Sequence, residues 1–149
     1  MIKKIVIYVL CLSVLFSQFS IAEEKFLSLK KSKVNVRYGP SFDSKIKYIY
    51  KKINLPIKQI DQKENFRRIV DLKNNSGWIH VSQVKKSNSI IILEDKILYK
   101  KPSNFSKPIA KLEKGRLLVL KKCENIWCNV KTEDYSGWVK TENIWGSIK

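Results

Sequence analysis

The segment Ser76-Gly77-Trp78-Ile79 is repeated sixty residues further along the chain as Ser136-Gly137-Trp138-Val139. A second tag, Gly39-Pro40-Ser41, has its counterpart in Lys101-Pro102-Ser103. The proline precedes the Gly-Trp glycine by 37 residues in the first copy and by 35 residues in the second, a difference that one surface loop absorbs. A repeat of this period indicates two copies of one small domain.

The residues ahead of the repeats have the features of a secretory signal peptide. Lys3 and Lys4 precede an apolar run over residues 5–16, and Ser20-Ile21-Ala22 provides small residues at a cleavage site. We therefore expect export to the periplasm, cleavage after Ala22 and only transient contact with the membrane through this leader. The alternative is an uncleaved membrane anchor, which needs about 20 apolar residues, more than this run provides.

Without residues 1–22 the chain keeps 127 residues, which the repeat divides into domains at 23–86 and 87–149. Domains of this size have small cores, so an additional restraint is expected. Cys123 and Cys128 provide one if they lie on the two arms of a hairpin and form a disulfide, the form favoured by an oxidising compartment. Two unreactive free thiols are the alternative interpretation.

The chain is strongly basic, with a net charge of +17 that becomes +15 when Lys3 and Lys4 are removed with the leader. A cytoplasmic protein of this charge would suggest nucleic acid binding. Export argues against that partner, and so does the small share of arginine, the residue that reads base edges best. Attraction to anionic polymers of the cell envelope, or solubility alone, remains.

Short segments with period-two alternation or continuous apolar character are typical of strands, and they recur in both copies. The expected strands cover residues 34–37, 45–50, 57–60, 66–70, 78–81, 90–93, 97–99, 117–120, 128–130 and 138–139. Turns are expected at 73–77 and 133–137, where Asn, Asp, Ser and Gly gather. No segment of the mature chain sustains a helical period, so the sequence predicts an all-β protein made of two small barrels.

Several of these segments resemble the bacterial SH3-like domain (SH3b) family. The first copy carries Val34-Asn35-Val36-Arg37-Tyr38-Gly39-Pro40-Ser41, Leu55-Pro56-Ile57, Phe66-Arg67-Arg68-Ile69 and Gly77-Trp78-Ile79-His80; the second carries Trp127-Cys128-Asn129-Val130, Gly137-Trp138-Val139 and Ile144-Trp145-Gly146. Residues 26–146 are thus similar to an exported protein with two tandem SH3-like domains and nothing else. The second copy departs from the pattern at residues 96–102, which lack the Asn and Gly of the first copy.

The resemblance implies a binding module that often recognises peptidoglycan, and it locates the candidate ligand-binding residues in the first copy. The aromatic residue that matches Phe66 lies beside the ligand groove in SH3 domains, and the run after the Gly-Trp pair, with His80 and Gln83, helps to line it. With Arg37 and Tyr38 these residues would form a cationic and aromatic cleft suited to a peptide with a free carboxylate. For His80, an ordinary half-exposed strand position is the alternative.

Trp78 and Trp138 have two interpretations of their own. Each follows the glycine of a turn at the start of a strand, and a large aromatic residue in that place is expected to anchor a core. A platform for carbohydrate is the alternative.

The sequence gives no support for an enzyme. His80 lies in the first copy and both cysteines of the mature chain lie in the second, so no Cys-His pair is expected. Neither a Gly-x-Ser-x-Gly motif, nor a metal-spaced histidine pair, nor a phosphate-binding glycine loop occurs. We expect no cofactor and no metal. The expected partner is a cell-wall polymer, with docking onto an envelope protein as the alternative.

Overall fold

The computed structural model describes residues 24–148, so the expected signal peptide lies outside the described residues. Two antiparallel sheets of seven strands each follow one another along the chain and share no strand. The first contains β1 (Lys25–Leu29), β2 (Val34–Arg37), β3 (Ile46–Tyr50), β4 (Pro56–Lys63), β5 (Phe66–Val70), β6 (Ser76–His80) and β7 (Val84–Lys86). The second contains β8 (Ser89–Ile92), β9 (Lys96–Tyr99), β10 (Pro108–Leu112), β11 (Leu117–Glu124), β12 (Trp127–Lys131), β13 (Ser136–Lys140) and β14 (Ile144–Gly146).

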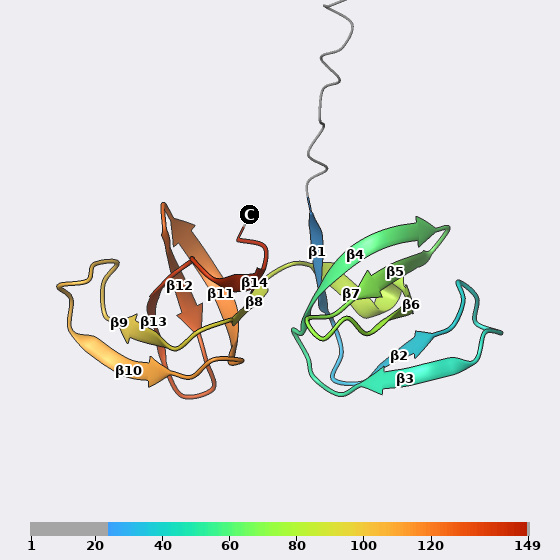
Figure 1. The fold of residues 1–149 in the computed structure, drawn as a ribbon, viewed down its shortest axis with the longest axis horizontal. Coiled ribbons are helices and arrows are strands. Elements are labelled where there is room, and N and C mark those ends of the chain that lie inside the picture. Colours follow the sequence, from blue (N-terminus) through green and yellow to red (C-terminus); the bar gives the residue numbers. More distant parts are fainter. Residues whose placement is uncertain (1–23, 149) are drawn as a thin grey trace, which may run out of the picture.

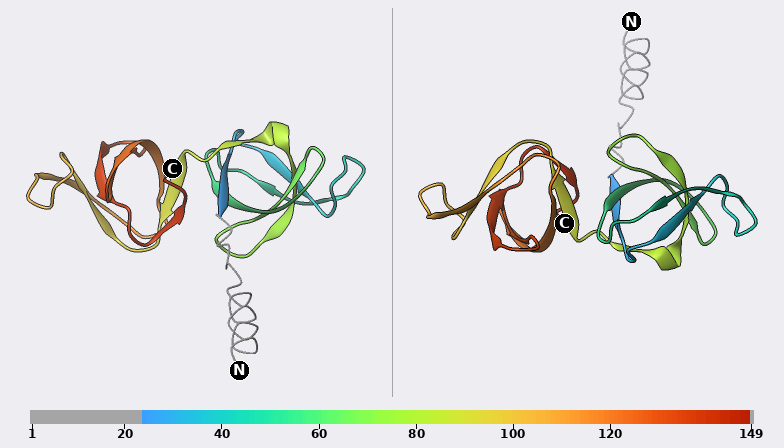
Figure 2. Two further views of the ribbon diagram at one scale, coloured as in Figure 1. Left: turned by 90° about the horizontal axis from the view of Figure 1, so that it is seen from above. Right: turned by 90° about the horizontal axis from the view of Figure 1, so that it is seen from below.

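The two sheets have the same strand order, which confirms the expectation of two tandem small β domains. The first runs β3-β2-β6-β5-β4-β1-β7 and the second β10-β9-β13-β12-β11-β8-β14. Each sheet curls around its own core, and the two domains lie side by side in an elongated molecule. The hairpins β2–β3 and β9–β10 project at opposite outer ends (Figures 1 and 2). Within residues 24–148, no helix is long and apolar enough to cross a membrane.

Four strands, β1, β7, β10 and β14, were not expected from the sequence. They are short or carry mixed polar and apolar residues. The partners of β1, β7 and β14 are set by the rest of the fold, since β1 pairs with β4 and β7, and β14 pairs with β8. A turn of 3-10 helix at Val81–Gln83 separates β6 from β7. Local alternation therefore identified the central strands, whereas tertiary pairing determines these additional ones.

Each domain has a small aliphatic core of its own. The first core is built from Leu29, Val34, Val36, Ile57, Ile69 and Ile79. The second is built from Ile90, Ile92, Leu98, Leu112, Leu118, Cys128, Val130 and Val139. Alternation along β6 places Ile79 inward, as expected for a strand with one buried face. Val139 takes the matching place in β13, where the residue before it, Trp138, is buried as well.

The expectation of a core anchor is wrong for Trp78, which is only half-buried and belongs to no core cluster. Trp138 is buried, as expected, although it too lies outside the core cluster of its domain. Gly77 faces inward instead, and a Cβ atom on it would lie 2.4 Å from a methyl group of Val36. Strand alternation then turns the next residue, Trp78, to the outer face. On the second domain Trp138 lies under Lys122, whose Nζ is 5.2 Å from the ring centroid.

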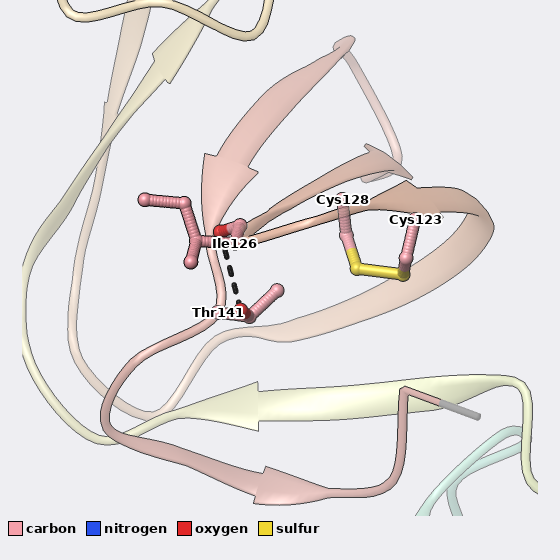
Figure 3. The surroundings of a disulfide bond; sticks show 4 residues. All are labelled: Cys123, Ile126, Cys128 and Thr141. Carbon is pink, nitrogen blue, oxygen red and sulfur yellow. Dashed lines mark hydrogen bonds between the residues drawn. A yellow bond between two sulfur atoms is a disulfide. The ribbon is translucent and has the colours of Figure 1, made fainter.

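The hairpin β11–β12 contains the expected disulfide between Cys123 and Cys128 (Figure 3). The two residues face each other directly in the strand register, and their Cα atoms are 4.0 Å apart. Beyond the bridge, the hydroxyl of Thr141 donates a hydrogen bond of 3.1 Å to the carbonyl of Ile126 at the tip of the hairpin. The bridge thus joins two strands at a place where the core ends, since Cys128 is buried and Cys123 is half-buried.

The two domains meet along a seam made by residues far apart in the sequence. The hydroxyls of Ser28 and Ser89 form a buried hydrogen bond of 2.7 Å, and Ser89 also donates to the carbonyl of Asn54. The indole N–H of Trp145 donates to the carbonyl of Pro56 at 3.0 Å, and its ring packs edge-on against Phe26 at 5.1 Å. Polar and aromatic contacts from the first strand and the last strand therefore hold the domains together.

Candidate functional site

Arg37 holds the loop between β2 and β3 in place. One of its terminal nitrogens, Nη1, donates to the carbonyls of Phe42 at 2.9 Å and of Ser44 at 2.7 Å. The guanidinium carbon lies 5.7 Å from the centre of the Phe42 ring. A guanidinium has five N–H donors, and no other described residue accepts from those that remain. Arg37 therefore has a structural role and still has free donors for a carboxylate.

Three aromatic rings gather under this loop, and we call Phe42, Phe66 and His80 the aromatic cluster. Phe66 and His80 face each other in the register of β5 and β6, with ring centroids 5.2 Å apart. Phe42 reaches them from the loop, at 5.2 Å from Phe66 and 4.9 Å from His80. Phe42 is 61 % exposed, whereas Phe66 is 6 % exposed. The surface of the cluster is thus formed by Phe42 and His80, and Phe66 supports them.

The expectation that Phe66 itself offers a surface to a ligand is therefore wrong. It rested on the position of the matching aromatic residue beside the ligand groove of SH3 domains. What the sequence did not reveal is that Phe42 lies on Phe66 and covers it. The available signal was an apolar residue within residues 39–45, which are otherwise Gly, Pro, Ser, Asp and Lys.

His80 caps the 3-10 turn that follows β6. Its Nδ1 accepts a hydrogen bond from the backbone N–H of Ser82 at 3.3 Å and lies 2.8 Å from the Ser82 hydroxyl. In the neutral ring an accepting Nδ1 leaves the proton on Nε2. No described residue accepts from that Nε2–H, so His80 presents a free donor at the exposed side of the cluster.

The other two expected site residues lie outside the cluster. Tyr38 is 67 % exposed, and its ring contacts the ammonium of Lys47 at 5.6 Å. The side-chain carbonyl of Gln83 accepts from the backbone N–H of Asn35 at 3.1 Å, which ties the 3-10 turn to β2. The structure therefore brings together Arg37, Phe66 and His80 of the five expected residues, adds Phe42, and gives Gln83 a structural contact.

A family model described as "Bacterial SH3 domain" matches residues 30–86 and again residues 95–146. The chain belongs to the bacterial SH3 domain family.

Among residues 24–148, no group of three or more His, Cys, Asp or Glu side chains is placed to hold a metal ion.

Comparison with solved structures finds similar folds at low identity. "Structure of NlpC2 from Trichomonas vaginalis" is 10 % identical, with a TM-score of 0.39 over 86 % of this chain and 50 % of that chain. "Structure of NlpC1 from Trichomonas vaginalis" is 10 % identical, with a TM-score of 0.38 over 90 % of this chain and 50 % of that one. The present chain thus spans about half the length of these proteins. No curated protein matches it.

The second SH3 domain repeats the loop of the first with different side chains. In the second domain the backbone N–H of Lys100 donates to the carbonyl of Lys107 at 3.0 Å. The equivalent bond in the first domain runs from the N–H of Tyr38 to the carbonyl of Lys45 at 3.1 Å. The ring of Trp127 contacts Tyr99 at 5.7 Å and the ammonium of Lys140 at 5.8 Å. The loop phenylalanine of this domain, Phe105, is 99 % exposed and has no ring partner among the described residues. The second domain therefore has no equivalent of the aromatic cluster.

Proposed function

We propose that this protein is a non-catalytic binding module of the cell envelope, and that its first SH3 domain binds a peptide of peptidoglycan that ends in a free carboxylate. The observation that carries the proposal is the aromatic cluster, where an exposed phenylalanine lies between two groups with free donors, Arg37 and His80. Membership of the bacterial SH3 family supports a binding role. Export and cleavage after Ala22 would bring the domain to this ligand in the periplasm.

The chemistry of the cluster fits such a ligand. A carboxylate that accepts from the remaining guanidinium N–H groups of Arg37 gains a charge-assisted hydrogen bond, which is about twice as strong as a neutral one. The ring of Phe42 offers an apolar surface to a methyl group or an aliphatic stem. The Nε2–H of His80 can donate to a peptide carbonyl on the other side of the ring. The proposal assigns no catalytic role to any of these groups.

The test is co-sedimentation of the mature protein with purified sacculi. We expect Phe42→Ala to weaken retention by about 2- to 10-fold, the range for loss of one aromatic contact. The matched control is Phe105→Ala, which removes the loop phenylalanine of the second domain and should leave retention unchanged. Because Phe42 is exposed, its removal should not unfold the domain.

Equal loss in both variants would contradict the assignment of the site to the first domain. Absence of co-sedimentation by the unmodified protein, together with co-purification of one defined envelope protein, would contradict wall binding. That result would favour the alternative function, docking onto another protein of the envelope.

A further inference from the structure

One face of the second domain is turned toward the first domain and is only partly covered by it. On β8, Ile91 lies opposite Trp145 of β14 on one side and opposite Leu117 of β11 on the other. Val119 of β11 lies between Ser89 of β8 and Lys131 of β12 in the same way. Residues opposite each other in an antiparallel pair share a face of the sheet, as do residues two apart in one strand. We call these six residues the seam face: Ser89, Ile91, Leu117, Val119, Lys131 and Trp145.

The covered part of the seam face lies on β8 and β14. Ser89 and Trp145 make the hydrogen bonds to the first domain described above. Ile91 is 7 % exposed although it is not part of the core cluster of the second domain, so the neighbouring domain contributes to its burial. The first domain therefore covers the seam face on β14 and β8 and leaves it open beyond β8.

The part of the seam face on β11 and β12 lines an open cleft of about 700 Å³ between the domains. From the second domain the cleft is lined by Arg116, Leu117, Val119, Lys131, Thr132 and Glu133; from the first domain, by Lys52, Ile53 and Asn54. The first domain contributes these residues from the turn between β3 and β4. The cleft therefore continues the interface that the seam forms between the two domains.

Two features of this lining differ from an ordinary exposed sheet face. Outward positions of an antiparallel sheet are usually polar, yet Leu117 and Val119 are apolar and half-buried, and Ile53 across the cleft is 49 % exposed. The three cations Lys52, Arg116 and Lys131 are exposed, and none forms an ion pair with a described residue. Glu133 is the only acidic side chain of the lining. An apolar floor is thus combined with an excess of unpaired positive charge.

We propose that the interdomain cleft binds an extended acidic peptide segment, with carboxylates directed to the three cations and apolar side chains on Ile53, Leu117 and Val119. A simple phosphate would use the cations and leave the apolar floor exposed. A membrane surface is too flat to enter a recess between two domains. Single-stranded nucleic acid is bound on aromatic rings, and the lining has none. This site is separate from the aromatic cluster and does not rest on the function proposed above.

The test uses the mature two-domain protein and a short, capped peptide of alternating glutamate and valine. The matched peptide has glutamine in place of every glutamate. Binding is followed by amide chemical shifts, and at low salt we expect the acidic peptide to shift the signals of Leu117, Val119 and Ile53. The glutamine peptide should shift them little, because the attraction acts between charges and is screened by salt.

The site variant is the double change Arg116→Gln and Lys131→Gln, which keeps two exposed positions polar and should not affect folding. We expect it to weaken binding at least about fivefold, as expected when two partly exposed charge pairs are lost together. The matched control is Lys100→Gln with Lys101→Gln, which removes the same charge from the hairpin at the outer end of the domain. The control should bind within about twofold of the unmodified protein.

Three results would overturn the proposal. One is equal weakening by the two double variants, which would mean that only net charge matters. Another is no binding of the acidic peptide at millimolar concentration, or shifts confined to other surfaces. The last is tighter binding of single-stranded DNA or of inorganic polyphosphate at the same signals, which would assign the cleft to a different class of ligand.

Discussion

The two SH3 domains share one backbone scheme and carry different side chains on it. Both hairpin loops contain an equivalent backbone hydrogen bond. The N–H of Ser44 donates to the carbonyl of Ser41 at 3.3 Å in the first loop, and the N–H of Ser106 donates to the carbonyl of Ser103 at 3.1 Å in the second. Only the first loop places a phenylalanine on a strand aromatic. The difference shows that the loop geometry belongs to the fold, whereas the aromatic cluster is specific to the first domain.

The domains are also reinforced by different means. The first has Tyr50, whose hydroxyl donates to the carboxylate of Asp71 at 3.0 Å. By strand register the second has Leu112 in the place of Tyr50. The second has its disulfide between Cys123 and Cys128, where the first has Gln62 and Arg67 in the same paired positions. Each small domain thus adds one restraint to a small core, and the two restraints differ in chemistry.

The largest effect is expected from a cavity in one core. Ile69 is fully buried in the first domain, and Ile69→Ala should lower the free energy of unfolding of that domain by about 2–5 kcal/mol. Hydrogen exchange read peptide by peptide should show faster exchange in residues 25–86 and little change in residues 89–140. Ile97→Ala, at a position 38 % exposed, is the control. Equal acceleration in both domains would mean that they unfold as one unit.

A smaller effect is expected from reduction of the disulfide. In the chain-entropy model a loop as short as the one closed by Cys123 and Cys128 contributes about 2 kcal/mol. A thiol reductant should therefore destabilise the second domain and leave the first unchanged, since residues 24–86 contain no cysteine. Hydrogen exchange measured at increasing denaturant concentration, with and without the reductant, gives the stability of each domain. A shift in the first domain would contradict the independence of the two.

The smallest effect is a dependence on high pH that Tyr50 gives to the first domain. Burial, followed by the contacts with Tyr48 and Asp71, raises the pKa of Tyr50 far above its usual value near 10. The unfolded tyrosine loses its proton near pH 10 and the folded one does not. The contribution of Tyr50 to stability is therefore constant below that pH and falls as pH rises above it. Tyr50→Phe should reduce this fall and cost about 1 kcal/mol at neutral pH through the lost hydrogen bond.

Absorbance of the tyrosinate in the unmodified protein provides the direct measurement. One late-titrating group should disappear in Tyr50→Phe. The second domain has Ala110 and Leu112 in the positions of Tyr48 and Tyr50, so the change should not alter its dependence on high pH. Loss of a group that titrates near pH 10 in the variant would show instead that Tyr50 ionises normally, and would contradict the prediction.

The sequence predicted the repeat, the all-β class, the central strands and the disulfide, because these follow from spacing and local alternation. It misjudged Trp78, where the preference of tryptophan for burial was given more weight than the alternation of β6. Period two, with Gly77 and Ile79 inward, already turns Trp78 outward. In this case the pattern was a better guide than the residue type.

The sequence could not predict the contacts that depend on distant partners. Phe42 covers Phe66 only because a loop folds back over β5. The apolar residue in that loop was visible in the sequence, but its partner was not. The seam joins Ser28 to Ser89 across 61 positions, and its face is recognised only when the register of four strands is known. The cleft and the cover of the aromatic cluster are therefore properties of tertiary structure.

The contact between Trp145 and Pro56 has a consequence for the order in which the molecule forms. The two residues are 89 positions apart, and Phe26, which packs on the same indole, is more distant still. Because synthesis proceeds from the amino end, every residue of the first domain has been made long before Trp145. The first domain can complete its own sheet without it. The contacts that Trp145 makes with the first domain can therefore form only after β14 has been made.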